Sequence, residues 1–286
     1  MSYRLGRLLP LLCFVAVLHA AAPNVTRSDA VSVAQELEAL PVTGSVLMIA
    51  AHPDDENTAL ISYLARGRKV RTAYLSLTRG EGGQNVIGSE KGPELGVIRT
   101  QELLASRRVD GAQQFFSRAI DFGFTKTPQE TLEKWGHDAV LGDIVWVIRK
   151  FRPDVVILQF TGTYRDGHGQ HQASGILGRE AYSAAADPAR LPEHFKYVRP
   201  WHATRLMVNR RGFTEAMQQE VNPLPGRLDI ELGQYDPVIG YSYGDLAGVS
   251  RSFNSSQSDG TPRVRGHLTT TLVTLSGPPA TNEDRK

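Results

Sequence analysis

The sequence predicts an α/β protein with a mostly parallel sheet flanked by helices. Short, nearly continuous apolar runs alternate with segments of helical periodicity between residues 46 and 186. Such runs are typical of strands covered on both faces, and parallel strands need crossover connections that are usually helices. The chain of 286 residues, with 41% hydrophobic and 22% charged residues, has the size and composition of one large globular domain with an extension.

The N-terminal segment has the three-part pattern of a secretory signal peptide. Arg4 and Arg7 precede an apolar run over residues 8–18, and the small residues 20–22 follow. We therefore expect residues 1–22 to be removed and the mature chain to be exported, to the periplasm or the outside of a bacterial cell, without a membrane attachment. The alternative is an uncleaved membrane anchor, which the shortness of the apolar run disfavours.

Loss of this segment would change two properties of the chain. Cys13 is the only cysteine, so the mature chain would have no disulfide and no thiolate ligand for zinc. Any metal would then be held by histidine, aspartate or glutamate. Removal of Arg4 and Arg7 lowers the number of basic residues from 32 to 30, equal to the 30 acidic ones. We therefore expect no nucleic-acid partner, and the sequence leaves the oligomeric state open.

The first half of the chain predicts two strand–helix units after a lead-in segment over residues 23–42. The lead-in has a helical spacing of apolar residues that ends at Pro41. Gly67 and Gly111 are expected just after two helices, because glycine readily takes the left-handed conformation of a C′ residue. The elements expected here are strands at 46–51 and 70–77 and helices at 54–66 and 94–110.

The second half begins regularly and then loses its pattern. Thr127, Pro128 and Glu130 form a helix start signal, with threonine as N-cap, proline at N1 and glutamate at N3. The predicted elements are a strand at 115–120, this helix up to Pro153, a strand at 155–160, weaker strands at 203–208 and 228–232, and a last helix at 241–256. We expect one domain over residues 43–257, followed at 258–286 by a polar tail whose composition favours disorder.

A histidine and three acids follow the first predicted strand, in the sequence Ala-His-Pro-Asp-Asp-Glu over residues 51–56. Acidic residues also suit a helix N-terminus, as caps and as partners of the helix dipole. That role does not account for His52 or for three consecutive acids, whose mutual repulsion a cation would offset. Parallel sheets carry their ligand sites beyond the carboxyl ends of their strands, so we predict a metal site here.

A second polar loop follows the strand predicted at 155–160. His168 and His171 lie in it, three residues apart among glycines. Solvated histidines in a surface loop are the alternative, but both loops follow strands that end at the same edge of the sheet, so we favour one shared site. The Gly-rich turn at 78–85 lacks the ending of a phosphate loop and the spacing of a dinucleotide fingerprint, which disfavours a nucleotide-dependent enzyme.

These motifs resemble the PIG-L / LmbE-like deacetylase family, in particular a secreted bacterial subgroup. The resemblance rests on the Ala-His-Pro-Asp-Asp-Glu motif, a Gly-His-x-x-His loop at 167–171, an Arg-Gly-Glu-Gly-Gly turn at 79–83 and Arg-Thr-Gln-Glu at 99–102. It implies a Rossmann-like, LmbE-like fold and zinc-dependent removal of acetyl groups from N-acetylglucosaminyl small molecules or glycans. Residues 235–252 resemble a segment of longer members, so a short member and a truncated one both stay open.

The resemblance also implies roles for individual residues. His52, Asp55 and His171 would hold the zinc ion, and Asp54 would be the general base. His168 would lie beside the metal and stabilise the oxyanion or protonate the leaving amine. Three protein ligands leave an open position, which is typical of catalytic zinc, although the same ligand set also suits iron(II).

One residue departs from the family pattern. Many members have an aspartate immediately before the last ligand histidine, where this chain has Gln170. Either Asp166 supplies that carboxylate to His168, or the pKa of His168 is set differently.

The sequence does not identify the substrate. Two alternatives to a deacetylase are a zinc amidase that acts on a larger acyl or peptide-like amide and a non-catalytic sugar-binding protein. The retained pair of aspartates disfavours the binding protein, because a binding module needs no base beside a metal. Candidate substrate contacts, each of which could equally be an ion pair, a solvated acid or a capping group, are Arg79, Glu81, Arg99, Tyr164 and Asp166.

Overall fold

The computed structural model describes residues 30–210, 219–220, 223–258, 260–263 and 266–281. Within these residues the main sheet has seven strands. They are β1 (Ser45–Ala50), β2 (Arg71–Ser76), β3 (Gln113–Phe116), β4 (Val155–Leu158), β5 (Arg205–Asn209), β6 (Arg227–Glu231) and β9 (Thr269–Ser276). A small separate ribbon pairs β7 (Tyr235–Asp236) with β8 (Tyr241–Ser242).

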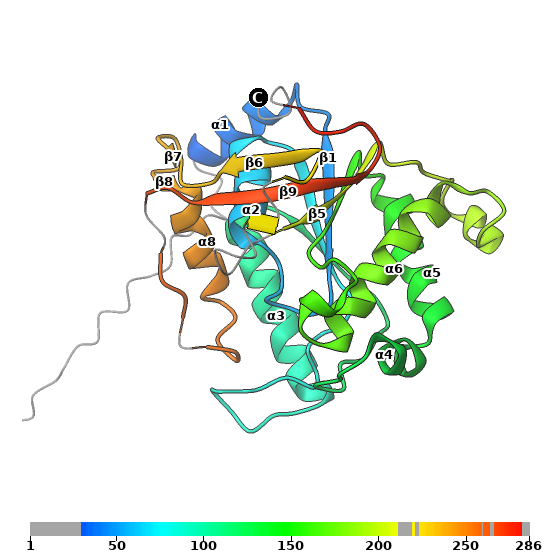
Figure 1. Cartoon of the computed structure of the whole chain (residues 1–286). Coiled ribbons are helices and arrows are strands. Elements are labelled where there is room, and N and C mark those ends of the chain that lie inside the picture. Colours follow the sequence, from blue (N-terminus) through cyan, green and yellow to red (C-terminus); the bar gives the residue numbers. More distant parts are fainter. Residues whose placement is uncertain (1–29, 211–218, 221–222, 259, 264–265, 282–286) are drawn as a thin grey trace, which may run out of the picture.

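The main sheet is mostly parallel, as predicted (Figure 1). Its order is β3-β2-β1-β4-β5-β9-β6. β1 pairs in parallel with both β2 and β4, whereas β9 pairs antiparallel with β5 and β6. The chain winds outward from β1 to β3 and then returns to the other side of β1 with β4. Ligand sites in α/β sheets lie outside the carboxyl ends of the strands at such a switch point.

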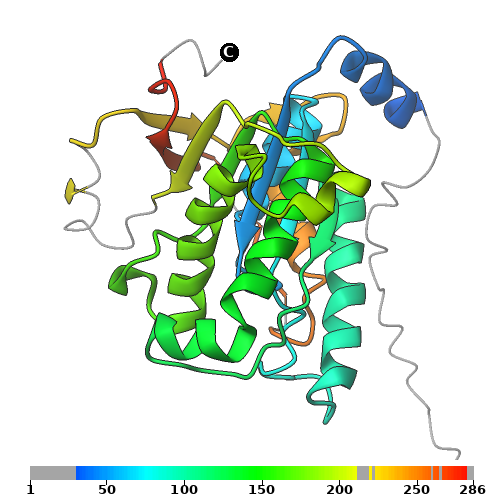
Figure 2. The ribbon, with the colours of Figure 1, turned by 90° about the vertical axis from the view of Figure 1, so that its right-hand side faces the viewer.

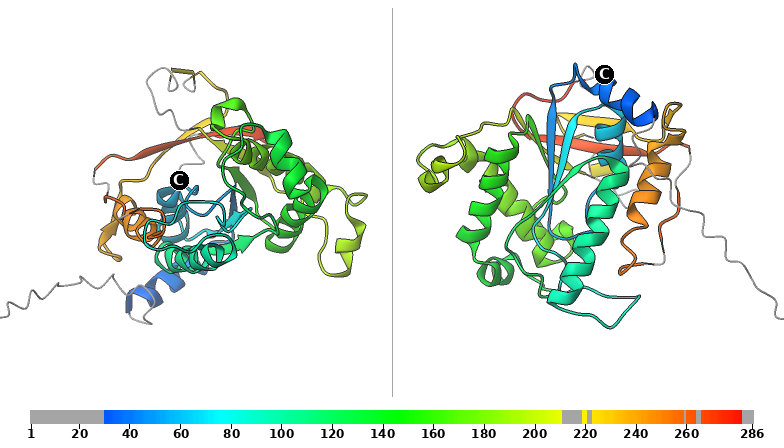
Figure 3. Two further views of the ribbon diagram at one scale, coloured as in Figure 1. Left: turned by 90° about the horizontal axis from the view of Figure 1, so that it is seen from below. Right: turned by 180° about the vertical axis from the view of Figure 1, so that it is seen from behind.

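Helices cover both faces of the sheet. One face carries α4 (Pro128–Trp135), α5 (His137–Phe151) and α6 (Gly169–Ala186), and Figure 2 shows α5 and α6 in front of the strands. The other face carries α2 (Thr58–Ser62), α3 (Pro93–Asp110) and α8 (Tyr243–Arg251). In the view from behind in Figure 3, α3 and α8 lie side by side. The short elements are α1 (Ala30–Ala39), η2 (Tyr164–Asp166) and η3 (Pro192–Lys196).

Strand β1 shows why the predicted strands are continuously apolar. Leu47 and Ile49 pack in the core under α4, α5 and α6, whereas Val46 and Met48 pack in the core under α2, α3 and α8. Successive side chains of a strand point to opposite faces, so a strand covered on both sides has no polar position. In the described part of the chain, no helix is both long enough and apolar enough to cross a membrane.

The helix predicted at 54–66 begins later than expected. Asp54 has φ of 88°, in the left-handed region, so the chain cannot be helical there. The helix begins at Thr58, where the side chain of Asn57 accepts a hydrogen bond from the backbone N–H of Leu60 at 3.1 Å. It then widens into a π-helix, η1 (Tyr63–Gly67), which ends at the predicted glycine.

Other predicted elements differ mainly in where they end. The helix expected from Thr127 to Pro153 is divided into α4 and α5, because Gly136 has φ of 75° between them. The strand expected at 115–120 lies earlier in the chain, as β3, and the helix expected at 241–256 is the shorter α8.

The prediction of a polar, disordered tail at 258–286 is wrong for the central part of that segment. Thr269–Ser276 forms β9, which lies inside the sheet between β5 and β6. Leu272 and Val273 of this strand are buried, one in each core. The strand is rich in threonine, a β-branched residue that favours strands but lowers the hydropathy of the segment. The domain boundary expected at residue 257 therefore lies too early.

A buried ion network ties the first loop of the sheet to α3. Arg107 donates to Glu56 Oε1 at 3.0 Å and to Asp110 Oδ2 at 2.7 Å, and all three side chains are almost fully buried. Ser250 of α8 also donates to Asp110 Oδ2, at 2.8 Å. The network thus fixes Glu56, the last residue of the first acidic motif, against two helices.

Replacing Arg107 by methionine should lower the free energy of unfolding by roughly 3–5 kcal/mol, because Glu56 and Asp110 would lose their buried cation. Arg118→Met is the matched control, since Arg118 pairs with Asp143 at the surface. Pairs of that kind contribute about 0–1 kcal/mol. Urea unfolding of both variants gives the comparison, and equal losses would contradict a structural role for the buried network.

Candidate metal centre

The loops that follow β1 and β4 meet at one edge of the sheet, as predicted. His52, Asp54 and Asp55 lie in the loop after β1, and His168 and His171 lie at the start of α6, after β4. Asp55 contacts both His52 and His171. The two clusters of possible metal ligands therefore form a single site at the switch point between the central strands.

Asp55 lies between two imidazoles. Its Oδ2 is 3.1 Å from His52 Nδ1 and accepts the backbone N–H of His52 at 2.7 Å, and its Oδ1 is 3.2 Å from His171 Nε2. The three side chains are between 11% and 19% exposed, so solvent screens these contacts only weakly. Burial by itself would raise the pKa of Asp55, but His171 and His52 outweigh burial and hold that pKa well below its usual range.

The second nitrogen of each imidazole has a hydrogen-bond acceptor. His52 Nε2 lies 2.5 Å from Gln170 Oε1, and the amide nitrogen of Gln170 donates to Gly123 O at 2.6 Å. His171 Nδ1 lies 2.9 Å from Asp166 O. These acceptors favour a proton on His52 Nε2 and on His171 Nδ1, so the nitrogens available to a metal ion are the ones that face the shared carboxylate.

This arrangement fits a metal ion. Donor atoms around a tetrahedral zinc ion lie about 3.3 Å apart, given bonds of about 2.0–2.1 Å, and the two imidazole–carboxylate separations are close to that value. Histidine ligands usually donate their other N–H to a carbonyl or carboxylate group, as His171 does here; His52 uses an amide oxygen. Ring nitrogens of His52, His168 and His171 also lie within 4.8 Å of one another. The imidazoles and the carboxylate at this site can therefore hold a metal ion.

The protonation of His52 agrees with a cation site. Burial, the largest single effect, lowers the pKa of His52, but Asp55, Asp121 and Gln170 together raise it to about 9. The acidic surroundings thus favour positive charge at this position. A metal ion bound here would replace the proton on Nδ1, because ligands must be deprotonated. Asp121, whose Oδ1 is 4.0 Å from His52 Nε2, is a buried acid that the sequence analysis missed.

His168 lies beside this group and has a different environment. Its ring centroid is 3.8 Å from that of His171 and 5.8 Å from that of the exposed Phe124. Its Nδ1 is buried, and no hydrogen-bond partner for it occurs among the described residues. Burial, followed by the charges of His171 and His52, lowers the pKa of His168 to about 4. The imidazole of His168 is therefore neutral near pH 7.

Gln170 and Asp166 have structural roles that the sequence did not reveal. Gln170 binds His52 and not His168. The carboxylate of Asp166 accepts backbone hydrogen bonds at 2.7–2.9 Å that close its own loop, from Thr161, Gly162 and Thr163. The sequence left two alternatives open: that Asp166 supplies the missing carboxylate to His168, or that other groups set the pKa of His168. The contacts of Gln170 and Asp166 agree with the second alternative.

Asp54 is held in an unusual conformation by a distant part of the chain. Its backbone N–H donates to Glu56 Oε2 at 3.0 Å, its carbonyl accepts from Arg251 Nη1 at 2.5 Å, and its carboxylate accepts from the side-chain amide of Gln257. Burial, the largest effect, and the charge of Asp55 raise the pKa of Asp54 to about 7, against the lowering effect of Arg251. Asp54 can therefore exchange a proton near neutral pH.

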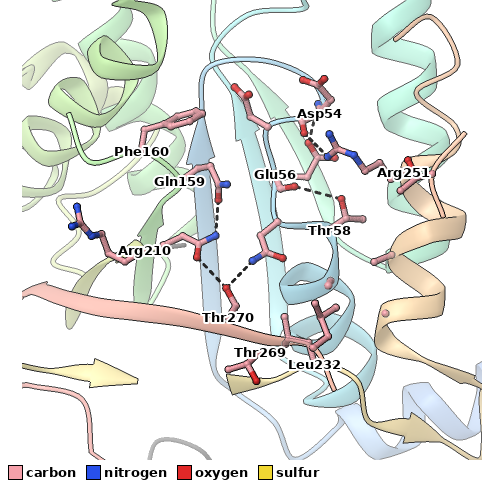
Figure 4. Close-up of a pocket in the computed structure, with 18 of the residues that line it drawn as sticks. Asp54, Glu56, Thr58, Gln159, Phe160, Arg210, Leu232, Arg251, Thr269 and Thr270 are labelled. Carbon is pink, nitrogen blue, oxygen red and sulfur yellow. Dashed lines mark hydrogen bonds between the residues drawn. The ribbon is translucent and has the colours of Figure 1, made fainter. Parts of the chain in front are cut away.

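A cavity of about 640 Å³ opens beside Asp54, Asp55 and His171 (Figure 4). Side chains from the loop after β4, from the end of β5, from α8 and from β9 form its other walls. It is large enough for a sugar-sized molecule. The edge of the sheet that carries the histidines and the C-terminal elements thus enclose one space.

A chain of hydrogen-bonded polar groups lies along this cavity. Asn57 Nδ2 donates to Thr270 Oγ1, Thr270 Oγ1 donates to Asn209 Oδ1, and Asn209 Nδ2 donates to Gln159 Oε1, each at 3.0 Å. Figure 4 shows these contacts as dashed lines. The sequence analysis missed all four residues, because Asn57 and Thr270 are 213 positions apart and no local motif connects them.

Of the five predicted substrate contacts, only Asp166 lines this cavity. Arg79 and Glu81 make contacts within the Gly-rich turn and with the loop after β3. Arg99 is buried and donates to a backbone carbonyl of the same turn at 2.9 Å. Tyr164 is mostly exposed. A role in substrate binding stays a prediction for each of them.

Residues 47–182 match the sequence profile of PIG-L, described as GlcNAc-PI de-N-acetylase. The match includes both loops of the metal centre. Residues 47–182 form a PIG-L (LmbE-like) family domain. The elements from β5 onward, which complete the cavity, lie outside the matched segment.

Curated relatives of this PIG-L domain are named as deacetylases. Diacetylchitobiose deacetylase of Thermococcus kodakarensis is 35% identical over 145 residues, which cover 50% of this chain and 51% of that protein. The 1D-myo-inositol 2-acetamido-2-deoxy-alpha-D-glucopyranoside deacetylase 2 of Frankia casuarinae is 29% identical over 171 residues, 53% of this chain and 54% of that protein. The chain thus spans about half the length of these relatives.

Solved structures share the fold. N,N'-diacetylchitobiose deacetylase of Pyrococcus horikoshii superposes with a TM-score of 0.50 and 18% identity, over 75% of this chain and 72% of that one. GalB of Pseudomonas putida KT2440, a 4-carboxy-2-hydroxymuconate hydratase, superposes with a TM-score of 0.53 and 14% identity, over 84% of this chain and 99% of that one. At these identities the similarity confirms the fold alone.

Replacing His171 by alanine should abolish stoichiometric metal binding, because it removes one of the two imidazole nitrogens that face Asp55. Metal analysis of the purified protein after incubation with zinc and desalting measures the effect. The matched control is His267→Ala, which removes a histidine that is almost fully exposed. Full zinc retention by the His171 variant would contradict the assignment of this residue as a ligand.

Proposed function

We propose that this chain is a metal-dependent N-deacetylase that removes the acetyl group from an N-acetylglucosamine-type amino sugar or glycoconjugate. The observation that carries the proposal is the pair of imidazole nitrogens that face Asp55, with Asp54 beside them and a cavity in front. The names of the curated relatives support the reaction and the substrate class.

The metal ion that we propose is zinc, with iron(II) as the alternative. His52, Asp55 and His171 would hold it, which leaves an open coordination position. When bound, the ion supplies Lewis acidity that polarises the amide carbonyl and makes water more acidic.

The protein's own residues would move the protons. Asp54, with a pKa near neutral, would accept a proton from the attacking water and deliver it to the departing amine. His168, neutral at pH 7, would donate a hydrogen bond through a ring N–H to the developing oxyanion. The balanced reaction consumes one water and releases acetate and a free amine.

Acetate release from a panel of N-acetylated amino sugars tests the proposal. The mature chain is assayed as purified, after chelation, and after zinc or iron(II) is added back. Release that disappears on chelation and returns with one of the metals supports the proposal and identifies the ion. Metal-loaded protein that releases no acetate from any member of the panel would overturn the proposed reaction.

Replacing Asp54 by asparagine should lower kcat by about 10²–10⁴-fold, because the variant keeps the size of the side chain but cannot accept a proton. Zinc content should stay equal to that of the wild type, since Asp54 does not face the imidazole nitrogens. Metal analysis and steady-state kinetics on the same preparation separate the two effects. Normal turnover would rule out Asp54 as the base.

Replacing Arg251 by methionine should lower kcat and move the acid limb of the pH–rate profile to higher pH. Activity requires the Asp54 carboxylate, and loss of a positive charge raises the pKa of that group. Arg251→Lys, which keeps the charge, is the control and should retain the position of the limb. A limb that stays in place in the methionine variant would show that Arg251 does not act on Asp54.

We also propose that the chain is exported. The support is the sequence pattern of residues 1–22, which lie outside the described residues. Mass spectrometry of the protein recovered from the periplasm or the medium tests this, because a processed N-terminus near Pro23 is expected. Recovery of the full-length chain from the cytosolic fraction alone would contradict the proposal.

A further inference from the structure

Among the described residues, every charged side chain that lines the cavity has a hydrogen-bond or ion-pair partner, with one exception. Arg165 pairs with Glu220 at 2.7 Å, and Arg251 donates to the carbonyl of Asp54 at 2.5 Å. The other acids of the lining have histidines, a buried arginine, a side-chain amide or backbone N–H groups as partners. The exception is Arg210, whose guanidinium has no hydrogen bond or ion pair with any described residue.

The backbone of Arg210 is held by the sheet although its head group has no partner in the described part of the chain. It follows β5 directly, and its backbone N–H donates to Thr271 O of β9 at 2.8 Å. Its side chain is half-buried, and Figure 4 shows it on the same wall as Gln159 and Phe160. An arginine whose backbone is tied to the sheet loses less freedom on binding a ligand than one on a free loop.

A second guanidinium interacts electrostatically with this one. Arg179 of α6 donates to Thr161 O at 3.0 Å, on the loop that borders the cavity. Burial, the largest effect, and the charge of Arg210 lower the pKa of Arg179, against the raising effect of Asp166. Two cations within electrostatic reach of each other repel, and an anion near Arg210 would offset that repulsion.

We propose that the Arg210 wall of the cavity binds an anionic group, a carboxylate or a phosphate, of the molecule whose acetamide lies at the metal centre. This inference rests on the proposed function and narrows its substrate class to N-acetylated amino sugars that carry negative charge. The planar guanidinium group matches the geometry of both anions, with two parallel N–H donors.

The rest of the wall suits the same ligand. The polar chain from Asn57 through Thr270 and Asn209 to Gln159 offers amide and hydroxyl groups of the kind that bind sugar hydroxyls. In Figure 4, Gln159 of this chain lies between Asp54 and Arg210. A sugar between the two ends could thus place its acetamide near Asp54 and its anionic substituent near Arg210.

The test compares neutral and anionic probes in the zinc-loaded protein. The probes are N-acetylglucosamine, its 1-phosphate and 6-phosphate, and N-acetylmuramic acid, which carries a carboxylate. Acetate release gives KM and kcat for each, and calorimetric titration of the same compounds gives affinity whether or not turnover occurs. We expect at least one anionic probe to have a KM and a dissociation constant lower than those of N-acetylglucosamine on the order of 10- to 100-fold.

Variants assign this preference to Arg210. Arg210→Gln should remove most of the difference in KM and in dissociation constant between the anionic and the neutral probes. Arg210→Lys should keep part of that difference. The matched control is Arg108→Gln, which removes an exposed arginine of α3 that does not line the cavity. This variant should show the same difference in KM and dissociation constant as the wild type.

The outcomes separate this inference from the proposed function. If no probe is turned over but the titrations show tighter, Arg210-dependent binding of anionic probes, the proposed deacetylase activity is overturned and the proposed anion site is supported. Turnover with equal affinity for neutral and anionic probes would support the proposed deacetylase activity and overturn the proposed anion site. An equal loss of preference in Arg108→Gln and Arg210→Gln would show a general charge effect and also overturn it.

Discussion

The carboxylate of Asp55 is the group on which the rest of the site depends. A buried carboxylate costs several kcal/mol unless charges or hydrogen bonds compensate it. Here two imidazoles supply that compensation, and each is oriented by a partner on its other side, His52 by Gln170 and His171 by the carbonyl of Asp166. Because Gln170 is in turn bound to the backbone of the loop after β3, three strand ends converge on one acid.

The C-terminal part of the chain completes a site whose ligands all come from the PIG-L domain. Arg251 and Gln257 hold Asp54, a non-glycine residue in the left-handed region, whose strain the surrounding contacts must offset. Strand β9 lies inside the sheet and supplies a wall of the cavity. The matched residues 47–182 therefore contain the proposed metal ligands, while the segment beyond them positions the proposed base and forms walls of the cavity.

The fold by itself would not have indicated a deacetylase. GalB, a 4-carboxy-2-hydroxymuconate hydratase, superposes on this chain at least as well as a diacetylchitobiose deacetylase does. Function is determined by the side chains placed at the switch point, and the same sheet can carry different ones. In this chain the side chains at that point are two imidazoles that face a shared carboxylate and a second acid whose pKa lies near neutral.

The sequence by itself determined the parallel core, the helix Pro93–Asp110 with Gly111 in the left-handed conformation, and the residue types of both ligand loops. These features follow from local periodicity, caps and strand ends, which a sequence displays directly. Only the tertiary structure decided the φ of Asp54, the partners of Gln170, the insertion of β9 and the lack of a partner for the Arg210 head group among the described residues. Each of these depends on contacts between residues far apart in the chain, and a polar segment such as Thr269–Ser276 becomes a buried strand only when two hydrophobic layers already exist to cover it.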